Sequence, residues 1–182
     1  FSNELNNIIS NKQIDFIIPA HDDVAFALSQ IENEIEAKII GQSRDVNEIV
    51  RFKDVTYEHF KDILPLGKVF DSEPQNDEFP IFVKPKKGQG SFNSLKLNTL
   101  DEYNSFFNQN KLDDFVIMEN LSGQEFTIDC FSDNGNVLYA GARTREKTTR
   151  GISIQSTYIS DTSLNKQFKK YTDIISQNLN MH

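Results

Sequence analysis

A lysine followed by a glycine-flanked turn is the strongest chemical signal in this chain. The stretch from Phe82 to Ser91 is FVKPKKGQGS, in which an apolar run delivers Lys84 and the turn Gly88-Gln89-Gly90-Ser91 follows. Glycines let backbone N–H groups approach an anion closely, and a lysine ammonium supplies a point charge for phosphate. The pattern indicates a phosphate-binding loop. It is not a Walker A loop, because no Gly-Lys-Ser/Thr follows the glycines. A plain hairpin turn with solvated lysines is the alternative.

A second signal lies between Phe115 and Glu125. An apolar run, Phe115 to Met118, leads into the linker Glu119, Asn120 and Leu121. Such a linker offers backbone N–H and C=O groups to the edge of an adenine ring, and the carboxylate of Glu125 is an acceptor for ribose hydroxyls. The alternative for Glu125 is an exposed strand carboxylate, because glutamate is rarely buried.

Composition narrows the classes of partner. The 182 residues carry a net charge of −8, 37% are apolar, and fifteen are Phe, so the chain can bury a core. The absence of a basic face argues against nucleic acid and anionic membranes as partners. The single cysteine, Cys130, sits in an apolar run and is interpreted as a buried thiol. With no signal peptide and no apolar stretch near the roughly 20 residues of a membrane span, the sequence favours the cytoplasm.

The elements that must position these residues begin with an α/β unit. Residues 14–18 and 37–40 are predicted strands, and the apolar stripe from Val24 to Ile35 between them predicts a helix. This strand–helix–strand order indicates a parallel α/β layer. The turn after Ile18 then lies at the carboxyl end of a strand, where such sheets often place ligands.

Further along, the pattern changes to short strands and helices. Ser43 and Thr56 are predicted to cap two helices, the second ending before Pro65, and Thr99 with Glu102 forms a capping box. Asn134-Gly135 predicts a hairpin turn. The remaining predictions are strands at 68–70, 80–84, 115–118, 124–131, 136–142 and 152–159, and a final amphipathic helix from Leu164 to Leu179.

The order and spacing of these pieces resemble the ATP-grasp superfamily, and within it the carbamoyl-phosphate synthase large subunit. The resemblance runs from about Ile14 to the last helix, and it includes Ile17 to Asp23, Ile40 to Ser43, Thr56-Tyr57 and Ala142 to Glu146. It implies an α/β fold with two α+β lobes, incomplete here. Residues 1–50 would end a pre-ATP-grasp domain, residues 51–118 would form the small lobe, and residues 119–182 would begin the large lobe.

The resemblance also implies roles for individual residues. Lys53 is similar to the first family lysine, near the α-phosphate, and Lys84 to the second. Residues Gly88 to Ser91 match the loop that closes on the β- and γ-phosphates. The adenine linker corresponds to Glu119, Asn120 and Leu121, and the ribose acid to Glu125. Arg143 and Arg145 fall where the family sends a cation toward the phosphates or the acyl phosphate, and Lys147 and Arg150 compete for that role.

Two features depart from the family pattern. Phe52 precedes Lys53 where the family usually has an aspartate, so a solvated helix lysine is the alternative. The Glu and Glu-x-Asn metal ligands of the family have no match between Gln155 and His182. Mg²⁺, which needs such oxygen ligands, is therefore expected in the full protein, with ligands outside this chain. Together with a start at Phe1, this predicts an inactive fragment of a longer protein.

The function implied by the resemblance is ATP-dependent ligation of a carboxylate to an amine-type nucleophile through an acyl phosphate. Its partners would be ATP and two small substrates, and a homodimer is one assembly that this interpretation allows. A nucleotide-binding module that regulates or assembles without ligation is the alternative. His21, Asp22 and Asp23 form a metal trio by composition, although the two aspartates also suit a helix N-terminus. His59 and His182 have no evident partner in the sequence.

Overall fold

A small parallel sheet begins the chain. The computed structural model describes residues 1–149 and 151–181, so Arg150 and His182 lie outside the described residues. Strand β1 (Phe16–Ile17) pairs in parallel with β2 (Lys38–Ile39), and α2 (Asp22–Gln30) connects them. This confirms the predicted parallel α/β arrangement. The helix α1 (Ser2–Lys12), which precedes it, is absent from the sequence-based prediction.

Helices α3 (Arg44–Arg51) and α4 (Lys53–Phe60) follow almost without interruption. The Ser43 cap is confirmed, because its Oγ accepts from the Val46 amide at 3.4 Å. The Thr56 cap is wrong. The backbone carbonyl of Phe52 already accepts from the Thr56 amide at 2.9 Å, so Phe52 is the N-cap and the helix starts four residues earlier than predicted. Thr56 lies inside α4 and donates its hydroxyl to the Ile49 carbonyl at 2.5 Å.

An antiparallel sheet in the order β4-β3-β5 forms the centre of the next region. It consists of β4 (Leu95–Leu97), β3 (Ile81–Pro85) and β5 (Phe115–Glu119). Ile81 and Val83 are fully buried, with Tyr103 of α5 (Leu100–Phe107) and Phe115 in the same core. Alternate residues of β3 therefore face this core, which turns Phe82 and Lys84 to the opposite face.

The structure differs from the predictions for this region at several points. Strand β4 was not predicted. The strand expected at 68–70 is a single bridge between Val69 and Met118. The Thr99 cap is confirmed by a 3.2 Å bond from the Glu102 amide, but the Glu102 carboxylate accepts from the Asn98 amide at 2.7 Å instead of from Thr99. Short 3₁₀ helices occur here at η2 (Asn76–Glu78) and η3 (Leu112–Asp114), and another, η1 (Glu32–Glu34), lies between α2 and β2.

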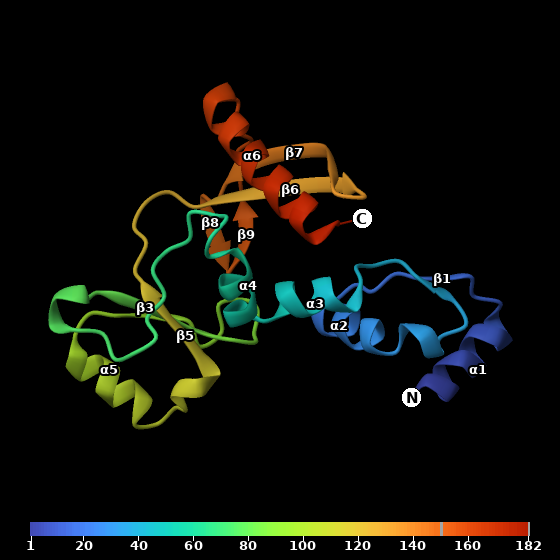
Figure 1. Ribbon diagram of the computed structural model, residues 1–182, viewed down its shortest axis with the longest axis horizontal. Coiled ribbons are helices and arrows are strands. Elements are labelled where there is room, and N and C mark those ends of the chain that lie inside the picture. Colours follow the sequence, from blue (N-terminus) through green and yellow to red (C-terminus); the bar gives the residue numbers. More distant parts are fainter. Residues whose placement is uncertain (150, 182) are drawn as a thin grey trace.

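A long hairpin and the final helix build the C-terminal region. Strands β6 (Phe126–Asp133) and β7 (Asn136–Thr144) meet at Asn134 and Gly135, whose φ values of 46° and 76° confirm the predicted turn. Helix α6 (Thr162–Leu179) lies across the hairpin (Figure 1). A smaller hairpin, β8 (Lys147–Thr149) with β9 (Ile152–Gln155), follows β7, so the strand predicted at 152–159 ends four residues early.

The predicted burial of Cys130 is wrong. The residue is exposed on β6, although its Sγ lies 4.0 Å from Ser176 Oγ of α6. The sheet holds only two strands here, and α6 covers only part of its face. An apolar neighbourhood in the sequence therefore does not bury the thiol in this region.

Figure 1 shows how the regions are arranged. The elements α1, β1 and α2 lie at one end, the β3–β5 sheet with α5 lies at the other, and α3 and α4 run between them. The β6–β7 hairpin and α6 lie above, with β8 and β9 between them and α4. Across residues 1–149 and 151–181, no helix has both the length and the apolar character that crossing a membrane requires.

Burial in the β3–β5 sheet predicts where stability resides. Replacing Ile81, which is 0% exposed, with alanine is expected to lower the free energy of unfolding by about 2–5 kcal/mol, because it leaves a cavity. The matched change Ile18→Ala, at a side chain that is 75% exposed, is expected to stay within about 0.5 kcal/mol. Urea denaturation measures both. Equal losses for the two variants would contradict this location of the core.

Candidate functional site

The start of α4 carries Lys53 to the glycine loop, which we define as residues 86–94. The Lys53 amide donates to the Lys86 carbonyl at 2.9 Å, which joins the first residue of the helix to the end of β3. The Lys53 Nζ donates to the Gly88 carbonyl at 3.0 Å. Lys53 is half-buried, in contrast to a solvated helix lysine. The residue predicted as the first phosphate ligand therefore touches the predicted loop.

Lys84 approaches from β3, on the face of the sheet opposite the core. Its Nζ donates to Tyr57 Oη at 3.0 Å and lies 4.8 Å from the centroid of the same ring. The Tyr57 hydroxyl in turn donates to the sulfur of Met118 at 3.3 Å. An aromatic face attracts a cation without neutralising it. Tyr57 therefore orients the ammonium group and leaves its positive charge available.

The two lysines influence each other electrostatically. The pKa of Lys53 lies below its ordinary value, first because burial disfavours the charged form and then because the positive charges of Lys84 and Arg51 are nearby. Within residues 1–149 and 151–181, neither Lys53 nor Lys84 forms an ion pair. Two uncompensated ammonium groups beside a glycine loop create an electrostatic environment that favours an anion.

Positive backbone angles shape the tip of the glycine loop. Gly90 and Ser91 have φ values of 66° and 55°. The tip packs against the turn of the β8–β9 hairpin at Gly151, where an added Cβ would meet the Ser91 hydroxyl and lie 3.0 Å from the Gly90 carbonyl carbon. Only glycine fits that close approach. The small hairpin and the glycine loop are thus in direct contact.

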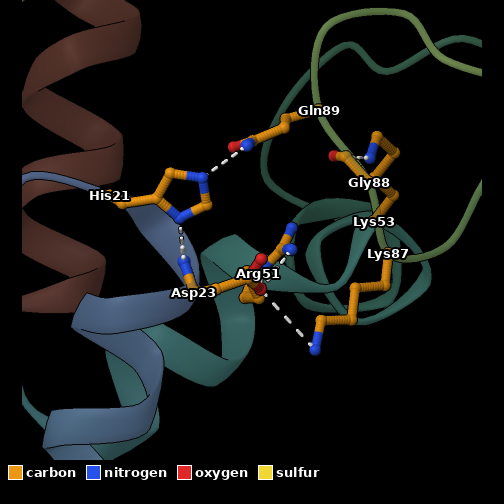
Figure 2. A network of polar contacts seen from close by, with 7 residues as sticks. All are labelled: His21, Asp23, Arg51, Lys53, Lys87, Gly88 and Gln89. Carbon is orange, nitrogen blue, oxygen red and sulfur yellow. Dashed lines mark hydrogen bonds and ion pairs between the residues drawn. The ribbon is translucent and has the colours of Figure 1, made fainter.

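The N-terminus of α2 holds the other side of the loop (Figure 2). His21 caps α2 by accepting from the Asp23 amide at 3.1 Å through Nδ1, and its Nε2 lies 2.7 Å from Nε2 of Gln89. Asp23 pairs with Arg51 at 2.5 Å and with Lys87 at 3.6 Å. The Arg51 side chain is only 7% exposed, and its hydrogen bonds hold the pKa of Asp23 below the ordinary value.

Asp22 and Asp23 lie in the first turn of α2, which agrees with the helix N-terminal interpretation of the two aspartates, whereas the cap at His21 was not predicted. Among the described residues, no group of three or more His, Cys, Asp or Glu side chains is arranged to hold a metal ion. We therefore assign no step to a metal held by this chain.

The two predicted catalytic arginines occupy different surroundings. Arg143 on β7 donates to Asp129 at 2.9 Å and to Ser156 at 3.1 Å. Arg145 donates through Nη2 to the Gly151 carbonyl at 2.7 Å, which brings it next to the glycine loop. Its Nε lies 3.0 Å from a Glu125 oxygen, but out of alignment for a hydrogen bond, so this buried N–H has no acceptor.

The linker residues are positioned by the end of β5. The Glu119 carboxylate accepts from the Lys68 amide at 2.7 Å, and the Glu119 amide donates to the Lys68 carbonyl at 2.9 Å. Asn120 is half-buried and Leu121 is 65% exposed. The side chain of Glu125 is 73% exposed and pairs with Arg145. The structure therefore joins Glu125 to Arg145.

Several residues of this site were not singled out for it by the sequence. Tyr57 orients Lys84, Asp23 holds Lys87, and Gly151 receives the loop tip. The contacts of Asp23 with Lys87 and of Gly151 with Ser91 join residues more than 50 positions apart, for which spacing carries no signal. Tyr57 was noted only as part of the resemblance, although an aromatic residue on the helix that begins at Lys53 could have suggested a lysine partner.

Comparison with known protein families finds a match for part of the chain. Residues 111–175 match the family model described as ATP-grasp in the biosynthetic pathway with Ter operon. No curated protein sequence matches the chain.

Solved structures similar to the chain include two kinds of enzyme. The biotin carboxylase domain of Hydrogenobacter thermophilus 2-oxoglutarate carboxylase, solved with MgADP, ADP and bicarbonate, has a TM-score of 0.75 at 14% identity, covering 100% of this chain and 46% of that one. The D-alanine–D-alanine ligase of Coxiella burnetii has a TM-score of 0.68 at 18% identity, covering 90% and 51%. The Bacillus anthracis ligase complexed with ATP has a TM-score of 0.69 at 18% identity, covering 99% and 64%.

The described chain thus spans about half to two thirds of these proteins. At such identities the likeness establishes the fold. The whole length of the chain follows that fold, and the family model covers its C-terminal third. The chain therefore has the ATP-grasp fold, in an incomplete form.

Proposed function

We propose that this chain is the ATP-binding portion of a ligase that joins a carboxylate to an amine or similar nucleophile through an acyl phosphate. The observation that carries the proposal is the pair of uncompensated ammonium groups, Lys53 and Lys84, at the glycine loop. Phosphoryl transfer depends on positioning and charge neutralisation more than on covalent protein chemistry. Lysines and loop amides provide both.

Each part of the nucleotide has a proposed place. Lys53 lies toward the α-phosphate, and Lys84 and the residues Gly88 to Ser91 serve the β- and γ-phosphates. The linker Glu119 to Leu121 receives the adenine, and Glu125 receives the ribose. Of the two arginines, Arg145 is better placed to reach the transferred phosphate, because its Nη2 bond to Gly151 sets it beside the loop.

The proposed chemistry has two steps. A carboxylate oxygen of the first substrate attacks the γ-phosphorus of ATP, and the bond to the departing ADP breaks. The nucleophile then attacks the carbonyl carbon of the acyl phosphate and releases inorganic phosphate. Water would destroy this intermediate, so a loop that covers the phosphates protects it. Mg²⁺ accompanies the nucleotide in this proposal and supplies charge neutralisation, with ligands that we do not assign to this chain.

The arrangement of the regions supports the proposed division of the chain. Residues 1–50 would form the end of a pre-ATP-grasp domain, residues 51–118 the small lobe, and residues 119–182 the beginning of the large lobe. Neighbours with the same fold include a structure solved with MgADP and one complexed with ATP. A closer similarity to the carbamoyl-phosphate synthase large subunit is also part of the proposal. The sequence motifs alone support it.

Loss of either lysine is expected to weaken ATP binding. Lys53→Ala and Lys84→Ala should each raise the Kd by roughly 10- to 100-fold, the effect of one charge-assisted hydrogen bond. The matched control is Lys169→Ala, because Lys169 is an exposed lysine paired with Asp173 on α6. Isothermal titration calorimetry gives the affinities, and circular dichroism confirms folding. ATP affinity that is equal in all three variants would remove both lysines from the site.

Binding of ATP should also depend on pH through Lys53. Because the pKa of Lys53 is lowered, its ammonium loses the proton at a lower pH than an ordinary lysine, and ATP affinity falls as the pH rises through that value. Lys84→Met removes a neighbouring positive charge and should raise the Lys53 pKa. NMR titration of ¹³C-methylated lysines measures it. A Lys53 pKa that stays the same or falls in this variant would contradict the coupling.

Trapping of the acyl phosphate distinguishes a ligase from a non-catalytic nucleotide-binding module. With ATP, a carboxylate substrate and hydroxylamine, the complete protein should form a hydroxamate and release ADP and phosphate in equal amounts. A panel of carboxylates screened by this reaction identifies the substrate. Tight ATP binding with no carboxylate-dependent release of ADP across the panel would favour the non-catalytic module.

A further inference from the structure

The face of the β6–β7 hairpin that lies away from α6 carries charged groups to which the proposed nucleotide site gives no role. Helix α6 packs on the other face, where the rings of Phe168 and Phe126 lie 5.2 Å apart between their centroids. Side chains alternate between the two faces of a strand. The face away from α6 therefore carries Thr127, Asp129 and Phe131 of β6.

An ion pair lies in the middle of this face. Arg143 of β7 donates through Nε to Asp129 Oδ2 at 2.9 Å and through Nη1 to Ser156 Oγ at 3.1 Å. Among the residues that the structure describes, Nη2 of Arg143 and Oδ1 of Asp129 have no hydrogen-bond partner. The two side chains are 35% and 57% exposed. A cation and an anion are thus side by side, each open to solvent and able to form further hydrogen bonds.

Two aromatic residues lie next to the ion pair, on the side toward the hairpin turn. Phe131 and Tyr139 are cross-strand partners and are 62% and 54% exposed. The phenol of Tyr139 lies over Gly141, the residue that faces Asp129 across the hairpin. A Cβ added at Gly141 would collide with this phenol. The absence of a side chain at Gly141 therefore lets the aromatic surface extend to the ion pair.

These groups follow a fixed order, starting from the glycine loop. Arg145, which donates to the Gly151 carbonyl beside the loop, is two residues from Arg143, or roughly 7 Å along an extended strand. Asp129 pairs with Gly141, two residues further from the loop, and the aromatic pair comes last. A cation, an anion and an apolar surface are therefore arranged in series, with the cation nearest the loop.

We propose that this face binds the carboxylate substrate and that this substrate is an amino acid with an apolar side chain. Its carboxylate binds Arg143, its ammonium group binds Asp129, and its side chain lies against Tyr139 and Phe131. A single carbon atom joins the two charged groups of an amino acid, so they reach adjacent groups of opposite charge together. The carboxylate is then the end nearest the glycine loop, where the γ-phosphate is proposed to lie. This inference rests on the proposed function and names the acid that the ligase would activate.

Leucine and two blocked derivatives test the recognition of both charges. N-acetyl-leucine lacks the ammonium group, and leucinamide lacks the carboxylate. Each should bind the complete protein about 10- to 100-fold more weakly than leucine, the effect of one charge-assisted hydrogen bond. NMR titration in the presence of a non-hydrolysable ATP analogue measures the affinities. Equal affinity for the three compounds, or no binding of leucine of either hand, would overturn the proposal.

Two substitutions distinguish substrate recognition from a structural ion pair. Arg143→Gln should abolish the preference for leucine over leucinamide and keep the preference over N-acetyl-leucine, and Asp129→Asn should do the reverse. A purely structural pair would instead weaken all three compounds by the same factor, which would contradict the proposal. Asp173→Asn, which breaks the exposed ion pair with Lys169 on α6, is the matched control and should change none of the affinities. If a variant does not fold, the wild-type comparison decides.

The aromatic pair is tested by the side chain of the ligand. Tyr139→Ala should weaken the binding of leucine by about 10-fold, because less apolar surface is buried, and leave the affinity for glycine unchanged. An equal loss for leucine and glycine would contradict the placement of the side chain.

Failure of this proposal is distinguishable from failure of the proposed function. Hydroxamate formation with ATP and a carboxylate that is not an amino acid, and none with amino acids, would keep the ligase and overturn the amino-acid site. A protein that recognises both charged groups of leucine but binds no ATP would keep the amino-acid site and overturn the proposed ligase.

Discussion

The hydrogen bond from the Lys53 amide to the Lys86 carbonyl joins the start of α4 to the end of β3, and the site depends on this junction. It brings two lysines from different elements to one glycine loop, although 31 positions separate them in the sequence. It also places Lys53 in a half-buried position, where its charge is costly. The fold therefore holds a half-buried ammonium group without a compensating negative charge, and an anionic ligand would supply that charge.

Neighbouring contacts leave the positive charges of the two lysines uncompensated. Tyr57 receives Lys84 through a hydroxyl and an aromatic face, neither of which cancels its charge, and Asp23 is occupied by Arg51 and Lys87. The carboxylates near the loop are thus directed to other cations. The Gly88 carbonyl accepts one hydrogen bond from the Lys53 ammonium, which has further N–H donors for an anion.

The sequence predicted the local elements with strong chemical signals and missed those set by distant contacts. The Asn134-Gly135 turn and the Ser43 and Thr99 caps are confirmed, because their determinants lie within a few residues. The Thr56 cap failed, since the helix already begins at Lys53, whose amide bonds to the carbonyl of the distant residue Lys86. The exposure of Cys130 depends on how far α6 extends over β6, and spacing does not encode that. The predicted loop and Lys53 do meet, and the ion pair between Glu125 and Arg145 joins two predicted site residues whose contact the spacing did not indicate.

A crystal structure of the chain with a non-hydrolysable ATP analogue would show whether the two lysines and the glycine loop form the nucleotide site. The phosphates are expected to lie within hydrogen-bond distance of Nζ of both Lys53 and Lys84, with loop amides facing the phosphates. An analogue bound elsewhere, or bound with Lys53 still joined to the Gly88 carbonyl and no phosphate near either lysine, would contradict it.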